Sequence, residues 1–247
     1  MPQWYDDDHF WTAFYPAMFS ESRWDSADEE VNAALGLLGI EPASQVLDFC
    51  CGPGRHSLVM AELGHQITAV DRTAAYLDIG RAKAQEAGVS IDFEQADVRD
   101  FRRIAEFDMA ISLFTSFGYF EDPRDDQKVL ANIHASLKPG GKLLMDMSGK
   151  EVIARTYHSM GWSEPEPGTL VLQDRKVRAG WEGIENHWIV IKDGERAEKR
   201  FFIRLYSGIE LKAMMLSAGF THVDLYGTLE GGPYDHNARR LVAVGVK

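Results

Sequence analysis

The chain has 247 residues, 45% of them hydrophobic, which is enough to bury a core as one domain or as one domain with an insertion. Its formal net charge of −12 argues against a partner held by phosphate neutralisation, and so against a nucleic-acid substrate. The two cysteines, Cys50 and Cys51, are adjacent, which strains a disulfide, and no spaced set of Cys and His predicts a metal site.

The N-terminal sequence predicts neither a signal peptide nor a membrane anchor. It carries three consecutive aspartates, Asp6 to Asp8, and lacks a positive segment followed by an apolar one. No apolar run approaches the ~20 residues that cross a bilayer. We therefore expect a cytoplasmic protein without a membrane partner, and the sequence leaves its oligomeric state open.

The first 40 residues begin with an aromatic-rich segment in which Phe10, Phe14 and Met18 share one helical face. This spacing fits an amphipathic helix that packs on a domain. It equally fits a lid over a ligand site, and one helix can do both because its two faces are independent. We expect residues 1–40 to form a helical lid.

The most informative segment is a strand, a glycine loop (residues 50–54) and a helix. The apolar run Val46–Cys50 ends at Gly52 and Gly54, and a helical pattern follows over 55–63. In a doubly wound α/β fold, a nucleotide-like ligand lies at this place, at the carboxyl end of the first strand. A second strand, 67–70, ends in Asp71, an acid placed to accept hydrogen bonds from ribose hydroxyls. The segment predicts a site for an adenosine-containing cofactor.

Alternating strands and helices follow as far as residue 147. The patterns predict a helix from Thr73 to Ala87, strands over 89–94, 107–113 and 142–147, and a helix that begins at Asp122-Pro123. This alternation implies a doubly wound, mostly parallel sheet with right-handed crossovers.

The pattern changes after residue 147. Ser148 and Glu151 predict a capping box for a short helix, and residues 162–168 read as a proline-containing turn. Three β-rich stretches follow, over 169–178, 183–192 and 195–206, with Asp193-Gly194 as a two-residue hairpin turn. We expect residues 151–206 to form an antiparallel β insertion.

A two-residue turn at Asp193-Gly194 fixes the register of the hairpin, because opposed residue numbers then sum to 387. One face carries apolar residues such as Ile184, Trp188 and Ile203, and we expect it to be a core. The other face, which includes Arg204 and Tyr206, is either solvated or the roof of a substrate pocket.

The end of the chain returns to the α/β pattern. Ser207 and Glu210 predict a capping box for a helix that ends at Gly219, and strands are expected over 221–226 and 240–246. The loop 228–239 joins these strands as a plain connection or as a substrate contact.

These motifs together resemble the class I S-adenosylmethionine-dependent methyltransferases. The run 48–54 is similar to the first motif of that family, Asp71 to its ribose-binding acid and Asp97-Val98 to its adenine-binding pair. The end of the strand 107–113 and the turn Leu137–Gly141 also match. The resemblance implies a seven-stranded sheet formed by residues 41–150 and 207–247, with 151–206 covering the active site, as in small-molecule N-methyltransferases of the glycine/sarcosine and amino-sugar kinds.

The resemblance implies S-adenosylmethionine as cofactor and methyl transfer to a small-molecule N- or O-acceptor, mainly by alignment and desolvation. The candidate cofactor-binding residues are Asp48, Cys50, Cys51, Gly52, Gly54, Arg55, Asp71, Arg72, Asp97, Val98 and Leu113. The candidate substrate-binding residues are Trp11, Tyr15, Phe117, Tyr119, Arg204, Tyr206, Tyr234 and His236. His56 and His236 are candidate general bases, and the sequence does not choose between them.

Two other functions stay open. A protein that binds the cofactor without catalysis has the same motifs. A nicotinamide oxidoreductase shares the fold logic, but its third fingerprint glycine is Ser57 here. The chain has no Asn/Asp-Pro-Pro-Tyr run after the fourth strand, which argues against methylation of adenine or of glutamine amides.

Overall fold

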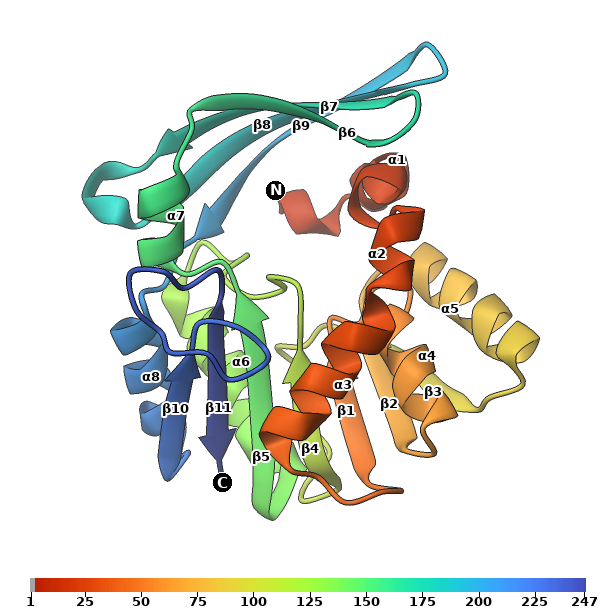
Figure 1. Cartoon of the computed structure of the whole chain (residues 1–247), viewed down its shortest axis with the longest axis vertical. Helices are drawn as coiled ribbons and strands as arrows, with labels where there is room; N and C mark the ends of the chain where they lie inside the picture. Colours follow the sequence, from red (N-terminus) through yellow and green to blue (C-terminus); the bar gives the residue numbers. More distant parts are fainter. Residues whose placement is uncertain (1–2) are drawn as a thin grey trace.

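The computed structural model describes residues 3–247 and contains two β-sheets (Figure 1). Met1 and Pro2, the first residues of the expected lid, lie outside the described residues. The larger sheet has seven strands in the order β10-β11-β5-β4-β1-β2-β3. These strands are β1 (Gln45–Phe49), β2 (Gln66–Asp71), β3 (Ile91–Gln95), β4 (Phe107–Ser112), β5 (Leu137–Met147), β10 (His222–Tyr226) and β11 (Leu241–Val246).

The pairing of the seven strands confirms the predicted fold class. Strands β1 to β5 pair in parallel, whereas β11 is antiparallel to both β5 and β10. Helices pack on both faces, because alternate residues of each buried strand point to opposite sides. Val46 packs with one face's core and its neighbour Leu47 with the other's.

Each face of the sheet has its own set of helices. The core that includes Val46 is completed by α3 (Ala27–Leu38), α4 (Arg55–Glu62) and α5 (Ala74–Ala87). The opposite core is completed by α6 (Pro123–Ser136) and α8 (Gly208–Ser217). The predicted capping box of α8 is confirmed, since Ser207 and Glu210 cap each other's backbone N–H groups.

The insertion forms the second sheet, which lies above the carboxyl ends of the parallel strands (Figure 1). Its antiparallel strands are β6 (Met160–Glu166), β7 (Thr169–Val177), β8 (Gly183–Lys192) and β9 (Glu195–Arg204), in that order. The predicted register is confirmed, since Lys192 pairs with Glu195 and Ile184 with Ile203. The turn predicted at 162–168 is wrong in its first part: Pro165 is tolerated because β6 is an edge strand with a register shift after Ser163.

The capping box predicted for Ser148 and Glu151 is also wrong. The short helix α7 (Lys150–Thr156) has Gly149 at its N-cap, with no side-chain cap. The carboxylate of Glu151 instead accepts hydrogen bonds from the Gly208 backbone N–H, at 3.1 Å, and from the Tyr234 hydroxyl, at 2.7 Å. A tertiary contact therefore takes the acid that the local motif would have used.

The N-terminal helices α1 (Asp8–Met18) and α2 (Glu21–Asp25) lie between the two sheets (Figure 1). Asp7 caps α1 by accepting from the backbone N–H groups of His9 and Phe10. Phe10 and Phe14 are buried against the insertion, in a cluster with Val171, Val190 and Phe201. The amphipathic helix of the sequence therefore packs mainly on the insertion.

Candidate functional site

A cavity of about 420 Å³ lies at the carboxyl ends of β1, β2 and β4, beneath the second sheet. This is the edge where ligands bind in doubly wound folds, because the loops there separate and leave space. Trp11 and Met18 of α1 line it from the side opposite the parallel strands. The helix that packs on the insertion thus also closes the cavity.

The glycine loop forms one wall. Cys50, Gly52 and Gly54 all have positive φ, of 56°, 57° and 77°, so the chain turns sharply out of β1 and into α4. A Cβ atom on Gly52 would lie 3.0 Å from the Phe19 ring, so glycine lets the end of α1 approach the loop closely. Cys50, Cys51 and Gly52 line the cavity, whereas Gly54 shapes the turn behind it.

Two aspartates hold this loop, Asp48, which is buried, and Asp71, which is half-buried. Asp48 accepts a hydrogen bond of 2.6 Å from the Ser57 hydroxyl, and burial raises its pKa to about 7. Asp71 accepts from the backbone N–H groups of Gly52 and Thr73, at 2.9 and 2.8 Å, one on each carboxylate oxygen. Burial also raises the pKa of Asp71. Because each oxygen has a second lone pair, Asp71 fixes the loop and can still accept from a ligand.

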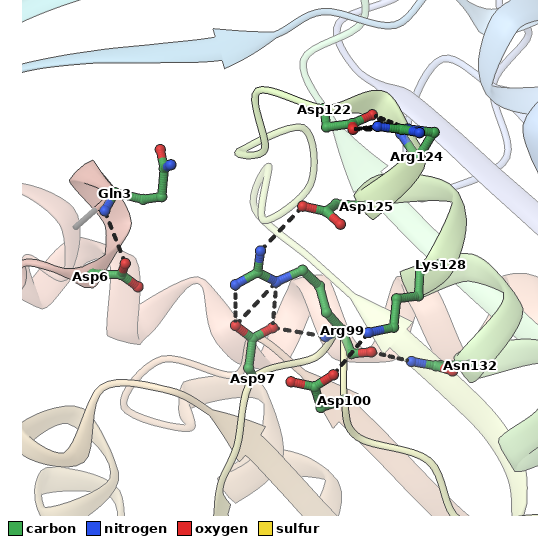
Figure 2. A network of polar contacts seen from close by, with 10 residues as sticks. All are labelled: Gln3, Asp6, Asp97, Arg99, Asp100, Asp122, Arg124, Asp125, Lys128 and Asn132. Atoms are coloured by element: carbon green, nitrogen blue, oxygen red, sulfur yellow. Dashed lines mark hydrogen bonds and ion pairs between the residues drawn. The ribbon is translucent and has the colours of Figure 1, made fainter. Parts of the chain in front are cut away.

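Asp97 is held by a neighbouring arginine (Figure 2). The Arg99 guanidinium donates to both Asp97 oxygens, with Nη2 at 2.6 Å, and its Nη1 reaches Asp125 at 3.2 Å. Burial alone would raise the pKa of Asp97, but the hydrogen bonds from Arg99 outweigh it and lower that pKa. Val98 and Phe120 line the cavity beside Asp97, so this end has an acid next to a flat apolar surface.

Arg72 also lines the cavity near Asp97, but its side chain is bound to residues 5–8. Its guanidinium donates to the Tyr5 carbonyl oxygen and lies 3.3 Å from Asp6 and 3.6 Å from Asp8. Tyr5 is buried, packs edge-on against Phe120, and also lines the cavity. The contacts of Arg72 therefore tie the start of the described chain to the end of β2.

Arg55 and His56, at the start of α4, are paired with Glu30 of α3. Both side chains are nearly fully buried, and Glu30 Oε2 lies 2.6 Å from Arg55 Nη1 and 2.7 Å from His56 Nε2. Burial would raise the pKa of Glu30, but these two partners lower it to about 2. Burial also lowers the pKa of His56, so His56 is a neutral, hydrogen-bonded group.

One donor of this cluster is free. Arg55 Nη1 donates to the Arg23 carbonyl oxygen at 2.7 Å, but Arg55 Nη2 is buried and has no partner within residues 3–247. The Arg23 and Arg55 guanidinium carbons lie 4.5 and 5.3 Å from the centre of the Phe114 ring. All three residues line the cavity, so the guanidinium groups of Arg23 and Arg55 lie at its wall beside the Phe114 ring.

Next to Phe114 and Thr115, the cavity lining contains a second arginine that is paired with an acid, Arg240 with Asp146. Arg240 donates from Nε and Nη2 to the two Asp146 oxygens, at 2.7 and 2.9 Å, and also to the Thr115 hydroxyl at 3.0 Å. Phe114 and Thr115 have φ of 64° and 63°, an uncommon conformation for residues other than glycine. The Arg240–Asp146 pair holds this strained turn.

The predicted substrate residues divide into two groups. The first group lines the cavity and consists of Trp11, Phe117 and Tyr119. The candidate base His56 and the predicted cofactor residue Leu113 line it as well. The second group is not part of the lining found within residues 3–247 and consists of Tyr15, Arg204, Tyr206, Tyr234 and His236. The Tyr206 hydroxyl donates to Asp126 at 2.6 Å, and Arg204 binds Glu182 and the Glu121 carbonyl oxygen.

The structure shows which face of the hairpin lines the cavity. The hairpin face that holds Ile184, Trp188 and Ile203 is the one that lines the cavity, together with Asn186 and, from β7, Arg175. The face expected as a possible roof, with Arg204, points away from the cavity. Alternation along a strand separates the two faces but cannot say which one the rest of the protein covers, and here α1 and the main sheet lie under the apolar face.

Sequence reasoning missed the cavity residues Arg23, Phe114, Arg175, Asn186 and Arg240. None belongs to a motif, and they come from five separate segments. Arg240 had one weak signal, since it immediately precedes the apolar strand β11. Among residues 3–247 no group of three or more His, Cys, Asp and Glu could hold a metal ion, and no helix is long and apolar enough to span a membrane.

Comparisons with known proteins agree with this geometry. Residues 46–141 match the family model of a methyltransferase domain. The ubiquinone biosynthesis O-methyltransferase of Xanthomonas axonopodis pv. citri is 35% identical over 146 residues, which covers 51% of this chain and 59% of the relative. That of Actinobacillus pleuropneumoniae is 34% identical over 112 residues, covering 44% and 46%. The chain thus spans about half the length of these curated relatives.

Solved structures resemble the whole chain. An S-adenosylmethionine-dependent methyltransferase from Clostridium acetobutylicum superposes with a TM-score of 0.80 at 13% identity, over 97% of this chain and 98% of the other. A SAM-bound amino pentose methyltransferase of Micromonospora echinaspora gives 0.66 at 20% identity, over 96% of each chain. At these identities the likeness establishes the fold, including the insertion.

Proposed function

We propose that this chain, which carries a class I S-adenosylmethionine-dependent methyltransferase domain, transfers a methyl group to a nitrogen or oxygen of a small molecule. One observation carries the proposal: a single cavity wall holds the glycine loop, Asp71, Asp97-Val98 and the unpartnered Nη2 of Arg55. These groups correspond to a ribose, an adenine and a carboxylate in one ligand.

The residues of the cavity fit that cofactor. Asp71 keeps lone pairs for the ribose hydroxyls, and Val98 offers an apolar face to the adenine. Asp97 would meet the adenine amine with the lone pairs that Arg99 leaves free. The buried Arg55 Nη2, together with Arg23, would bind the methionine carboxylate, since a guanidinium suits a carboxylate and an unpaired buried donor is costly. Cys50, Cys51 and Gly52 would lie along the chain between these ends.

When bound, S-adenosylmethionine supplies a sulfonium-activated methyl group, so the protein has little bond chemistry to perform. The side chains of this chain would bind, align the acceptor and exclude water. Trp11 and Met18 of α1 close the cavity on one side, and Trp188 and Ile203 on another. His56 Nε2 donates to the Glu30 carboxylate, so a role as general base would fall to the other ring nitrogen, Nδ1.

The proposal extends to a cytoplasmic enzyme that acts on small molecules. Both cysteines are free, which fits a reducing compartment. The cavity is closed on several sides and lined mainly by aromatic and aliphatic side chains, which suits a small acceptor better than a nucleic acid.

Calorimetry with S-adenosylhomocysteine, the demethylated product, tests this function. The wild-type protein should bind it and should not bind NAD. Asp71→Asn should weaken the binding by about 1–3 kcal/mol, or roughly 5- to 150-fold, because a charged acceptor of ribose hydroxyls becomes a neutral and poorer one. Asp78→Asn, an exposed change on α5, serves as the control and should bind normally. Binding of NAD instead, or an Asp71→Asn variant that binds like the control, would overturn the proposal.

A further inference from the structure

The charges around the cavity are unevenly distributed. Three carboxylates line it, Asp48, Asp71 and Asp97, and all lie at the end proposed for the cofactor. The remainder of the lining has four arginines and no carboxylate. These four are Arg23, Arg55, Arg175 and Arg240.

Two of the four arginines are neutralised from behind the wall. Arg55 pairs with Glu30 and Arg240 with both oxygens of Asp146. Within residues 3–247, no ion pair involves Arg23 or Arg175. Arg23, beside Arg55, is placed to share the carboxylate of the cofactor. Among residues 3–247, Arg175 is then the one positive charge of the cavity with neither a carboxylate partner nor a proposed part in cofactor binding.

Arg175 belongs to the roof, on the inner face of β7. It pairs in register with Asn186 of β8, so the two side chains lie next to each other on that face. Its Nε is buried without a hydrogen-bond partner. Gly161 of the neighbouring strand β6 lies close by, since a Cβ atom there would be 4.0 Å from Arg175 Nη2, an ordinary contact distance.

Two other residues of the roof have N–H groups left to donate. Asn186 is 7% exposed, and its amide nitrogen donates to the Ile184 carbonyl oxygen at 3.2 Å. The Trp188 Nε1 is buried without a partner. Within residues 3–247 the roof therefore presents two unpartnered N–H donors and one uncompensated positive charge, which suit a ligand with acceptor atoms and negative charge.

We infer that the methyl acceptor is a small carboxylic acid, held through its carboxylate by Arg175 in the roof. The planar guanidinium matches a carboxylate bidentately, and Asn186 and Trp188 lie on the same face to donate further hydrogen bonds. The aromatic side chains Phe114 and Phe117 in the lining suit an apolar or aromatic body for this acid. The inference rests on the proposed function, because it names the acceptor for the same cavity.

Calorimetry with paired ligands tests this inference, both with and without saturating S-adenosylhomocysteine. The probes are benzoate, 4-hydroxybenzoate and phenylacetate, each with its neutral amide, and phenyl phosphate. Carboxylates should bind the wild-type protein at least about tenfold more tightly than their amides. Arg175→Gln should remove this preference and leave the affinity for the amides unchanged.

Two further variants make the test specific. Lys176→Gln removes the same charge from the adjacent, exposed position on the other face of β7, and it should keep the preference for carboxylates. Arg175→Lys keeps the charge but loses the planar fork, so its carboxylate affinity should lie between those of the wild type and Arg175→Gln; it also replaces Arg175→Gln if that variant does not fold.

The outcomes separate this inference from the proposed function. If S-adenosylhomocysteine binds but amides bind as well as carboxylates, the inference is wrong and the function stands. Equal losses in Arg175→Gln and Lys176→Gln, or tighter binding of phenyl phosphate than of the carboxylates, would also overturn it. If S-adenosylhomocysteine does not bind, the proposed function fails, and an Arg175-dependent preference without it would still establish the carboxylate site.

Discussion

Replacing Glu30 by glutamine should destabilise the fold substantially, because at the start of α4 Glu30 neutralises the Arg55 charge and accepts a hydrogen bond from His56. Its carboxylate lies 2.6 Å from Arg55 Nη1 and 2.7 Å from His56 Nε2. The pKa of Glu30 falls from 4.5 to about 2 in the folded chain. A difference of about 2.5 units corresponds to roughly 3 kcal/mol in the free energy of unfolding, as an upper limit.

The pH dependence of this loss follows from the direction of the shift. A carboxyl group whose pKa is lowered by folding stabilises the fold when it is ionised. The contribution of Glu30 is therefore complete above about pH 4.5 and disappears as the pH falls towards 2. The difference between wild type and Glu30→Gln should be largest at pH 7 and about half as large at pH 3.

Urea denaturation followed by tryptophan fluorescence measures these differences. Glu29→Gln is the matched control, since Glu29 is exposed on the same helix. A surface change of this kind alters stability by less than about 0.5 kcal/mol. The reasoning fails if Glu30→Gln is as stable as the control at pH 7, or if the difference grows as the pH is lowered.

Two other predictions concern how the insertion joins the main domain. Gly118→Ala would place a Cβ atom 2.5 Å from the Arg204 carbonyl oxygen and should lower the melting temperature strongly. Gly140→Ala is the control, because Gly140 also has a positive φ but a Cβ atom there would meet nothing within 4 Å. Similar melting temperatures for the two variants would refute the close contact. Tyr206→Phe removes a 2.6 Å hydrogen bond to Asp126, whose pKa burial raises to about 6, and should cost about 1–3 kcal/mol of unfolding free energy. Because that bond favours the ionised carboxylate, the cost in urea denaturation should be larger at pH 8 than at pH 5; an equal cost at both would contradict this assignment.

The parts of the site that could be predicted are those encoded locally. The glycine loop and Asp71 lie within a strand-loop-helix-strand unit, where periodicity and turn residues determine the backbone. The hairpin register followed from Asp193-Gly194 alone, since a two-residue turn leaves only one pairing. These features needed no knowledge of the rest of the chain.

The remaining parts depend on contacts between distant segments. A basic pair at the start of α4 is unfavourable at a helix N-terminus, and the compensating acid, Glu30, lies on another helix with no pattern to mark it. The sequence left open whether the hairpin face with Arg204 is solvated or a roof, because α1, not the strand sequence, decides which side of the insertion is covered. Arg175 belongs to no sequence motif, and only the fold brings it into the lining of the cavity.

A crystal structure of the protein grown with S-adenosylhomocysteine tests the central claim most directly. The ligand should occupy the cavity with its ribose hydroxyls on Asp71, its adenine beside Val98 and its carboxylate at Arg23 and Arg55, leaving Arg175 free for the acceptor. A ligand bound in the reverse direction, with its carboxylate on Arg175, or one bound outside the cavity would contradict the account.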